Sequence, residues 1–369
     1  YSLILPLFYY GNESTSKMIY PDMDKAIKKG SKLIKLHSIT NKPNRKKGRK
    51  SKKEREFFAK NEYNAWIDEA YLLMGKAHFH KLDYNSALES FNYIIKEFQD
   101  EPTKYEAYIW IARTYIEQKD FVKAREVLDL VDGDRGLPKK MIGELQITYT
   151  DYYFKQDKFE EGIQYLKKAI DNTRKKKYRT RYKFILAQLY QKSEDFENAT
   201  DLYNQVIKAN PTYDMIFSSR IRKASCFSVG SGRAENLHKE LQKMLKDDKN
   251  IEYQDQIYYA MAEIEMKQGN VDKALSFYQL SSEKSLMNTN QKAVSFLAMA
   301  DIYYKRPEYR NAQTYYDSTL FFIDPAFPNI KDISFNSEIL TRLIENLDII
   351  DREDSLQMVA GMTEAQRET

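Results

Sequence analysis

The chain has 369 residues and a formal net charge of +5, and its 31% charged and 42% hydrophobic residues exclude a wholly disordered protein. No apolar run approaches the roughly 20 residues of a transmembrane helix, so we expect no integral membrane protein. With 12 glycines and 9 prolines the chain is poor in the turn residues that a many-stranded β-sandwich needs. Its single cysteine, Cys226, excludes an internal disulfide and a cysteine-ligated metal cluster.

Residues 1–40 predict the end of a preceding helical repeat. The apolar stretch at 3–10 is too short to span a bilayer and is interrupted by Pro6, and the sequence starts without a methionine. We therefore expect any targeting signal to lie outside this sequence. A helix is expected from Pro21 onward, because proline followed by acids is typical of a helix start. Its apolar face comprises Ala26, Ile27, Gly30, Leu33 and Ile34.

Residues 41–55 predict a basic loop. Nine lysines and arginines and one glutamate lie between positions 42 and 55, and this net +8 exceeds the charge of the whole chain. We interpret the stretch as a solvated loop between helices, with contact to an acidic surface as the alternative. It contains no aromatic residue that could stack on a base, so we expect no nucleic-acid partner. A long helix is expected to begin near Glu54 and to run through Trp66.

Residues 56–325 repeat one pattern about every 37 or 38 positions. A small residue is followed four positions later by a large one, and the small residues are separated by steps of 37, 38, 37, 75 and 38. Each copy predicts two helices folded back on each other, which cannot close a core alone, so the copies must stack. The small and large residues of the copies are Ala87 and Phe91, Ala124 and Leu128, Gly162 and Leu166, Ala199 and Tyr203, Ala274 and Tyr278, and Ala312 and Tyr316.

These residues resemble the tetratricopeptide repeat, in which an alanine of the second helix is followed four positions later by a large aromatic residue. The resemblance covers about residues 70–321 and implies an all-α superhelical solenoid of about seven antiparallel helix pairs. The step of 75 contains a degenerate copy near 215–246. There Gly230 and Gly232 predict a flexible joint at 228–234, Asn236 stands where alanine is expected, and Cys226 is expected to be a buried thiol.

Residues 326–369 predict a closing helix and the start of a C-terminal continuation. Apolar residues recur at three- and four-residue spacing, which places them on one face of a helix. They are Ile339, Leu340, Leu343, Ile344 and Leu347.

The sequence contains none of the common catalytic or nucleotide-binding motifs. No phosphate-binding loop, dinucleotide-binding fingerprint, serine-hydrolase elbow or zinc-protease motif occurs. His78 and His80 are two positions apart on an expected helix and therefore face different directions, whereas helical metal ligands are spaced by three or four. The acid pairs at 68–69 and 247–248 are expected on solvated faces. We expect no enzyme, no cofactor and no metal.

The first helices of the copies predict a wall on which a polypeptide segment could bind. Residues one repeat apart on that wall combine charged and apolar side chains, which suits a polypeptide better than a nucleic acid. The alternative is that these residues only solvate the wall or close the superhelix. The candidate partner-binding residues are Leu72, Lys76, Ile109, Arg113, Ile147, Asp151, Phe184 and Gln188.

Three blocks of the chain are similar, in combination and in order, to one lineage of repeat proteins. They are residues 5–39 with the basic loop that follows, residues 66–91, and residues 352–360. They resemble the PorW/SprE-type tetratricopeptide-repeat lipoproteins of the Bacteroidetes type IX secretion system, which supports gliding motility. The resemblance implies a periplasmic protein that links the outer-membrane translocon to periplasmic ring and motor components. It also implies an outer-membrane anchor through an N-terminal lipid outside this chain; Cys226, expected within a helix, cannot replace the lipidated cysteine.

Three functions follow as hypotheses. The first is a non-enzymatic scaffold that bridges parts of a secretion machine. The second is a chaperone or adaptor that binds peptide segments on the wall of first helices. The third is a regulator that binds nucleic acid through residues 42–55, with a salt dependence that phosphate contacts would produce.

Overall fold

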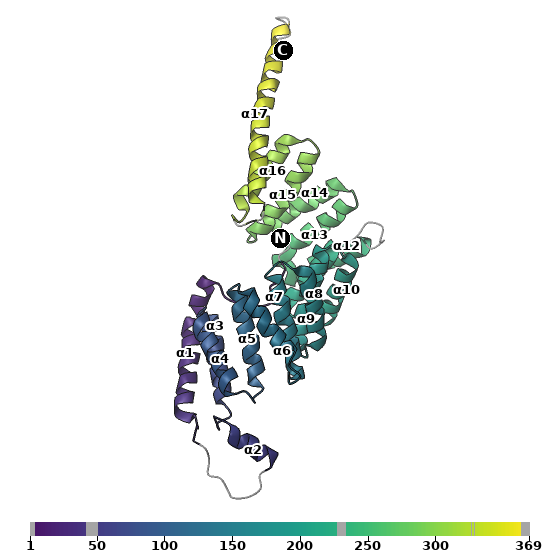
Figure 1. Ribbon diagram of the computed structural model, residues 1–369. Coiled ribbons are helices and arrows are strands. Elements are labelled where there is room, and N and C mark those ends of the chain that lie inside the picture. Colours follow the sequence, from purple (N-terminus) through teal and green to yellow (C-terminus); the bar gives the residue numbers. More distant parts are fainter. Residues whose placement is uncertain (1–3, 42–50, 227–233, 326, 328, 363–369) are drawn as a thin grey trace. The chain divides into compact units, whose positions relative to one another are not determined.

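The computed structural model describes residues 4–41, 51–226, 234–325, 327 and 329–362 (Figure 1). In these residues every regular element is a helix. The chain divides into two compact units, which we call the N-terminal unit (Ile4–Tyr190) and the C-terminal unit (from Gln191 onward), and each is described by itself.

The N-terminal unit stacks helix pairs against one another. Helices α3 and α4, α5 and α6, and α7 and α8 pack as pairs, α4 packs on α5 and α6 on α7, and α1 covers α3. A short 3-10 turn, Lys139–Met141, precedes α7. The helices are α1 (Glu13–His37), α2 (Lys52–Ala59), α3 (Ile67–His80), α4 (Tyr84–Glu97), α5 (Thr103–Glu117), α6 (Phe121–Asp132), α7 (Ile142–Phe154), α8 (Phe159–Asn172) and α9 (Lys176–Lys192).

The C-terminal unit is built in the same way. Helices α13 and α14 and helices α15 and α16 pack as pairs, α14 packs on α15, and α17 packs on α16. A 3-10 turn, Asp248–Tyr253, precedes α13. The helices are α10 (Phe196–Lys208), α11 (Tyr213–Ser225), α12 (Ala234–Leu245), α13 (Gln254–Lys267), α14 (Val271–Lys284), α15 (Thr289–Lys305), α16 (Tyr309–Phe322) and α17 (Ile330–Gly361).

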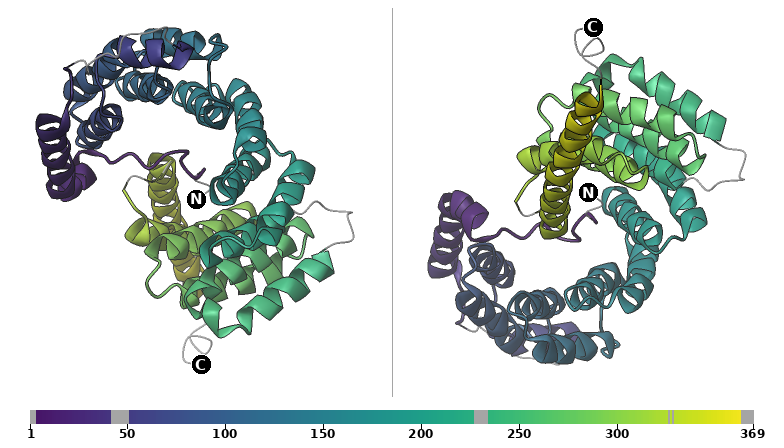
Figure 2. Two further views of the ribbon diagram at one scale, coloured as in Figure 1. Left: turned by 90° about the horizontal axis from the view of Figure 1, so that it is seen from below. Right: turned by 90° about the horizontal axis from the view of Figure 1, so that it is seen from above.

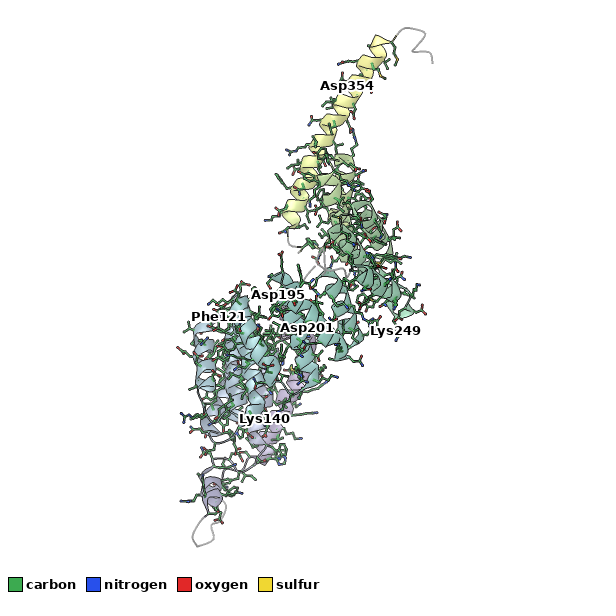
Figure 3. All side chains as sticks on the ribbon, turned by 90° about the vertical axis from the view of Figure 1, so that its right-hand side faces the viewer. Phe121, Lys140, Asp195, Asp201, Lys249 and Asp354 are labelled. Atoms are coloured by element: carbon green, nitrogen blue, oxygen red, sulfur yellow. The ribbon has the colours of Figure 1, made fainter. Side chains whose placement is uncertain are left out.

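The predicted repeat register is confirmed by burial. All six small residues are buried, and all six large residues that follow them are at most 2% exposed. The turns between the paired helices recur at the same spacing. The residue two positions before the second helix has a positive φ at Leu82, Lys119, Asp157, Glu194 and Gly269. The next residue caps the second helix, and at Asp83, Asp120 and Asp195 its carboxylate accepts a backbone N–H bond (Asp195 is labelled in Figure 3).

Gly75 allows the close approach of α3 and α4. A Cβ atom at this position would lie 2.8 Å from Cδ1 of Phe91 and closer still to Cε1, and the Phe91 ring is fully buried. Gly75→Ala is therefore expected to lower the free energy of unfolding by about 1–3 kcal/mol, measured by urea denaturation. The control is Gly30→Ala, where the new methyl group meets the flexible side chain of Met74 and should cost little. Equal effects of the two substitutions would contradict this assignment.

The first helix begins earlier than predicted. It starts at Glu13 rather than at Pro21, which lies inside α1. A capping box explains this start, because the Asn12 side chain accepts the Thr15 N–H while the Thr15 hydroxyl accepts the Asn12 N–H. The predicted apolar face is confirmed: Gly30 is buried against Met74, and Leu33 and Ile34 pack into the core of the first pair.

The predicted long helix from Glu54 through Trp66 is wrong. Helix α2 ends at Ala59 and α3 begins at Ile67. The intervening residues bond to the end of α1 instead of continuing a helix. The Glu62 carboxylate accepts the Ile39 N–H at 2.7 Å, and the Asn64 side chain donates to the His37 carbonyl at 2.8 Å. Such side-chain bonds compete with the helical ladder. Of the predicted basic loop at 41–55, residues 42–50 lie outside the described residues, and residues 52–55 form the start of α2 instead of a loop.

The degenerate copy keeps the repeat spacing. Leu241 is buried at 1% exposure and lies 38 positions after Tyr203 and 37 before Tyr278. The position equivalent to the small residues is thus Leu237, which packs in the core, whereas Asn236 is exposed. The predicted glycine joint lies outside the described residues. Cys226 is buried as predicted, and burial raises the pKa of its thiol to about 11.

The apolar residues at 339–347 lie in a helix, α17, which extends beyond them on both sides. Its first half packs on α16 through Ile333, Leu340 and Ile344. Ile339 is exposed, so it does not belong to the packed face. The second half of α17, around Asp354, extends away from the other helices of its unit (Figure 3).

Candidate functional site

The N-terminal segment, residues 4–11, lies across the first helices of the N-terminal unit. It has neither helical nor strand structure and ends at the cap of α1. Its contacts run from α9 at Leu5 to α3 at Tyr10, and Figure 2 shows it as a purple trace on the inner side of the curved row of helices. We call the surface that it crosses, formed by α3, α5, α7 and the part of α9 before residue 191, the first-helix face.

Helix α9 holds the beginning of the segment through polar groups. The Leu5 N–H donates to Oε1 of Gln188 at 2.9 Å. The Arg181 guanidinium donates to the Pro6 carbonyl and, at 3.3 Å, to the Tyr9 hydroxyl, and it lies 4.5 Å from the centre of the Tyr9 ring. These contacts fix the direction of the backbone at this end.

Arg113 of α5 binds the middle of the segment. Its guanidinium lies 4.4 Å from the centre of the Phe8 ring and 5.1 Å from that of Trp110, a cation–π geometry on both rings. Its Nε donates to the Thr148 hydroxyl at 3.1 Å, and Nη2 donates to the Glu144 carboxylate at 2.7 Å. Because α7 supplies both acceptors, Arg113 presents a fixed flat cation to the segment.

Tyr10 anchors the end of the segment in the core. Its ring stacks on Phe8 at 5.1 Å between centroids and meets Phe79 edge-on at 4.9 Å. Burial raises the pKa of the Tyr10 phenol, the Arg113 charge lowers it and the Asp151 charge raises it. The Tyr10 hydroxyl and Oδ2 of Asp151 are buried without a hydrogen-bond partner among the described residues.

The structure separates the eight predicted residues into two groups. Arg113 and Gln188 contact the segment, Asp151 is buried on α7, and Lys76 pairs with Glu106 beside the Trp110 ring. The other four are apolar side chains that are also buried, and one of them, Ile109, lines the pocket beside Arg113. They are Leu72, Ile109, Ile147 and Phe184.

The occupant itself was missed in the sequence. The pattern of residues 3–10 predicts only a short apolar stretch. Two signals were present: Pro6, which disfavours a helix for the residue before it, and a run of three aromatic residues that a solvated end does not need.

A pocket of about 480 Å³ adjoins the face at Arg113. It is lined by α5, the start of α7 and the turn before α9, with Trp110 and Tyr178 as its aromatic walls. Three cations at its rim make no ion pair among the described residues: Lys140, Arg174 and Lys175 (Lys140 is labelled in Figure 3). Arg113 thus contacts the bound segment and also lines this open pocket.

We expect release of the segment to expose the buried Asp151 carboxyl, which predicts a pH dependence. Burial raises the pKa of Asp151 to about 7, with Lys155 and Arg113 lowering it and Glu117 raising it. An exposed carboxyl has a pKa near 4, so between these values the closed state holds a proton that the released state does not. The closed state is therefore favoured at low pH and loses stability as the pH rises toward 7.

We expect the released population to increase about tenfold or more between pH 5 and pH 8. Hydrogen–deuterium exchange of residues 4–11 measures this, with rates corrected by those of an unstructured peptide of the same sequence. In the control Asp151→Asn the dependence should flatten. An identical pH profile in both proteins would contradict the role of this carboxyl.

Other polar side chains contact one another away from the segment, and burial lowers the pKa of His238. His78 contacts the Asp83 cap at 3.1 Å, and His238 lies 2.8 Å from the Glu265 carboxylate. Asp68 is buried and accepts a bond from the Thr103 hydroxyl at 2.6 Å, so its predicted exposure is wrong: α5 covers it. Within the described ranges no cluster of three or more histidine, cysteine or acidic side chains has the arrangement of a metal site. No helix there combines the length and the apolar character that crossing a membrane requires.

Comparisons with known proteins identify the repeat. One tetratricopeptide-repeat model matches residues 72–138, which contain α4, α5 and α6, and another matches residues 180–213, which contain α10. The fold is an all-α tetratricopeptide-repeat solenoid, the architecture of scaffolds for protein–protein interaction. No curated protein sequence matches the chain.

The solved structures that are similar to the chain include the following two. One is NprR in complex with its cognate peptide NprX, with 13% identity, a TM-score of 0.42, and coverage of 81% of this chain and 90% of NprR. The other is the TPR domain of P58(IPK), with 12% identity, a TM-score of 0.24, and coverage of 88% of this chain and 99% of that domain.

Proposed function

We propose that the chain is a non-enzymatic scaffold that holds extended polypeptide segments on the first-helix face. One observation supports this most strongly: the face already holds such a segment, residues 4–11, through Gln188, Arg181 and Arg113. The segment is bound by side chains from two different first helices at once. A row of first helices is the feature that stacking of repeats provides, and a single helix pair could not supply it.

Within this function, we assign the scaffold to a type IX secretion system. The resemblance of residues 5–39, 66–91 and 352–360 to the PorW/SprE-type lipoproteins supports the assignment. The scaffold would then lie in the periplasm, anchored to the outer membrane through an N-terminal lipid outside this chain, and would link the translocon to ring and motor components. The peptide-binding adaptor hypothesis is compatible with this role, because a connector must bind segments of its partners.

Affinity purification of the native full-length protein, followed by mass spectrometry, tests this assignment. We expect outer-membrane translocon and periplasmic ring components to co-purify and the protein to fractionate with the outer membrane. As a control, Arg342→Ala, an exposed substitution in the C-terminal unit, should retain the same partners. A cytoplasmic protein without these partners would contradict the secretion role, and salt-dependent binding of DNA or RNA would favour the nucleic-acid hypothesis instead.

A further inference from the structure

Aromatic side chains of the N-terminal segment contact the first-helix face, and Leu7 of the segment is buried at 7% exposure. Phe8 and Tyr10 are two positions apart, stack on each other and face α3 and α5, whereas Tyr9 lies between them, is 69% exposed and contacts Arg181. Side chains two apart in a non-helical backbone share one side, as in an extended chain. The face therefore contacts Phe8 and Tyr10 through α3 and α5, and Tyr9 through Arg181 of α9.

The segment leaves some polar groups of the site without hydrogen-bond partners. Among the described residues, the backbone groups of the segment that bond to the helices are the Leu5 N–H and the Pro6 carbonyl. The Tyr10 hydroxyl and Asp151 Oδ2 are buried without a hydrogen-bond partner, and a buried unpartnered polar group opposes the closed state. The pocket beside Arg113 is left open by the segment. An occupant with further polar contacts could therefore bind better.

We propose that the first-helix face is the binding site for an extended, aromatic-rich segment of a partner protein, and that residues 4–11 are its displaceable intramolecular competitor. The inference deepens the proposed scaffold function and rests on it. Arg113 and Arg181 define the partner chemistry, because each places a guanidinium on an aromatic ring of the occupant. The segment is joined directly to α1, so its effective concentration is high and it masks the face until a partner competes.

Fluorescence anisotropy with a labelled peptide tests the proposal. The probe carries the sequence of residues 4–11 with a polar tail for solubility. The full chain with Phe8→Ser and Tyr10→Ser, whose own segment is weakened, should bind the probe at least about tenfold more tightly than the unsubstituted chain, because competition at high effective concentration is removed. The control is Met18→Ser on α1, outside the segment, where the side chain is 80% exposed; this protein should bind the probe like the unsubstituted chain.

Two further controls locate the binding site. Adding Arg113→Glu to the Phe8→Ser and Tyr10→Ser chain should abolish binding of the probe. A probe with serine at the two anchoring aromatic positions should not bind to any of these proteins. Equal binding of the probe to the weakened and the unsubstituted chain would overturn the competition, and binding that survives Arg113→Glu would overturn the site.

A measurement on the unsubstituted chain covers the case in which the weakened chain fails to fold. Excess unlabelled peptide should increase deuterium uptake in residues 4–11 without increasing it in α15 and α16. Unchanged uptake at a saturating concentration of peptide would overturn displacement. If the peptide fails here while translocon components still co-purify with the full-length protein, this inference falls and the scaffold function stands.

Discussion

Phe91→Ala is expected to lower the free energy of unfolding of the N-terminal unit by about 3–5 kcal/mol. The Phe91 ring has no exposed area, contacts the backbone region of Gly75 in its own pair and stacks on Trp110 of the next pair at 6.2 Å. Truncation therefore removes packing within one copy and between two copies. Since no copy closes a core alone, the loss affects the whole stack rather than one hairpin.

Urea denaturation followed by circular dichroism measures this effect. The control is Leu73→Ala on α3, where the leucine is 52% exposed and its removal should cost less than about 0.5 kcal/mol. If Phe91→Ala were no more costly than Leu73→Ala, the interlocking of copies through the large residue of each second helix would be wrong.

Arg113→Ala is expected to release the N-terminal segment and to destabilise the N-terminal unit by about 2–3 kcal/mol. The Arg113 side chain is buried, packs on the rings of Phe8 and Trp110, and donates to Thr148 and Glu144. Its loss leaves a void and an unpaired Glu144, and the cost stays moderate because that carboxylate is half exposed and keeps its water.

Arg113→Lys is expected to restore little of this stability. An ammonium group lacks the planar guanidinium that can pack on two aromatic rings and donate to two acceptors at the same time. Deuterium uptake of residues 4–11 measures release, and urea denaturation measures stability. Arg342→Ala is the control, since its side chain is exposed in the C-terminal unit and its pair with Glu338 contributes little. A protected segment in Arg113→Ala would show that this arginine does not hold it.

The periodic part of the fold could be predicted because it depends on local chemistry. Each copy needs a small residue where its helices approach and a large residue four positions later. This spacing is visible in the sequence of all six copies, from Ala87 and Phe91 to Ala312 and Tyr316. The break between α2 and α3 could not be predicted. It depends on Glu62 and Asn64 bonding to the end of α1, more than 20 positions earlier, and no local pattern contains that contact.

The residues that the helices contribute to the candidate site could be predicted, but the segment that lies on them could not. Repeat spacing places Arg113, Asp151 and Gln188 on successive first helices, which is a property of the array. What lies on them depends on where the chain returns, and residues 4–11 reach the face only because α1 packs on α3. The burial of Asp68 was missed for the same reason, since the start of α5 covers it.

Photo-crosslinking from position 8 tests the central claim most directly. Benzoylphenylalanine in place of Phe8 should crosslink within one chain to α5 near Trp110 and Arg113, with a yield that does not depend on protein concentration. Crosslinks to any other helix, or only between two chains, would show that the first helices do not hold this segment.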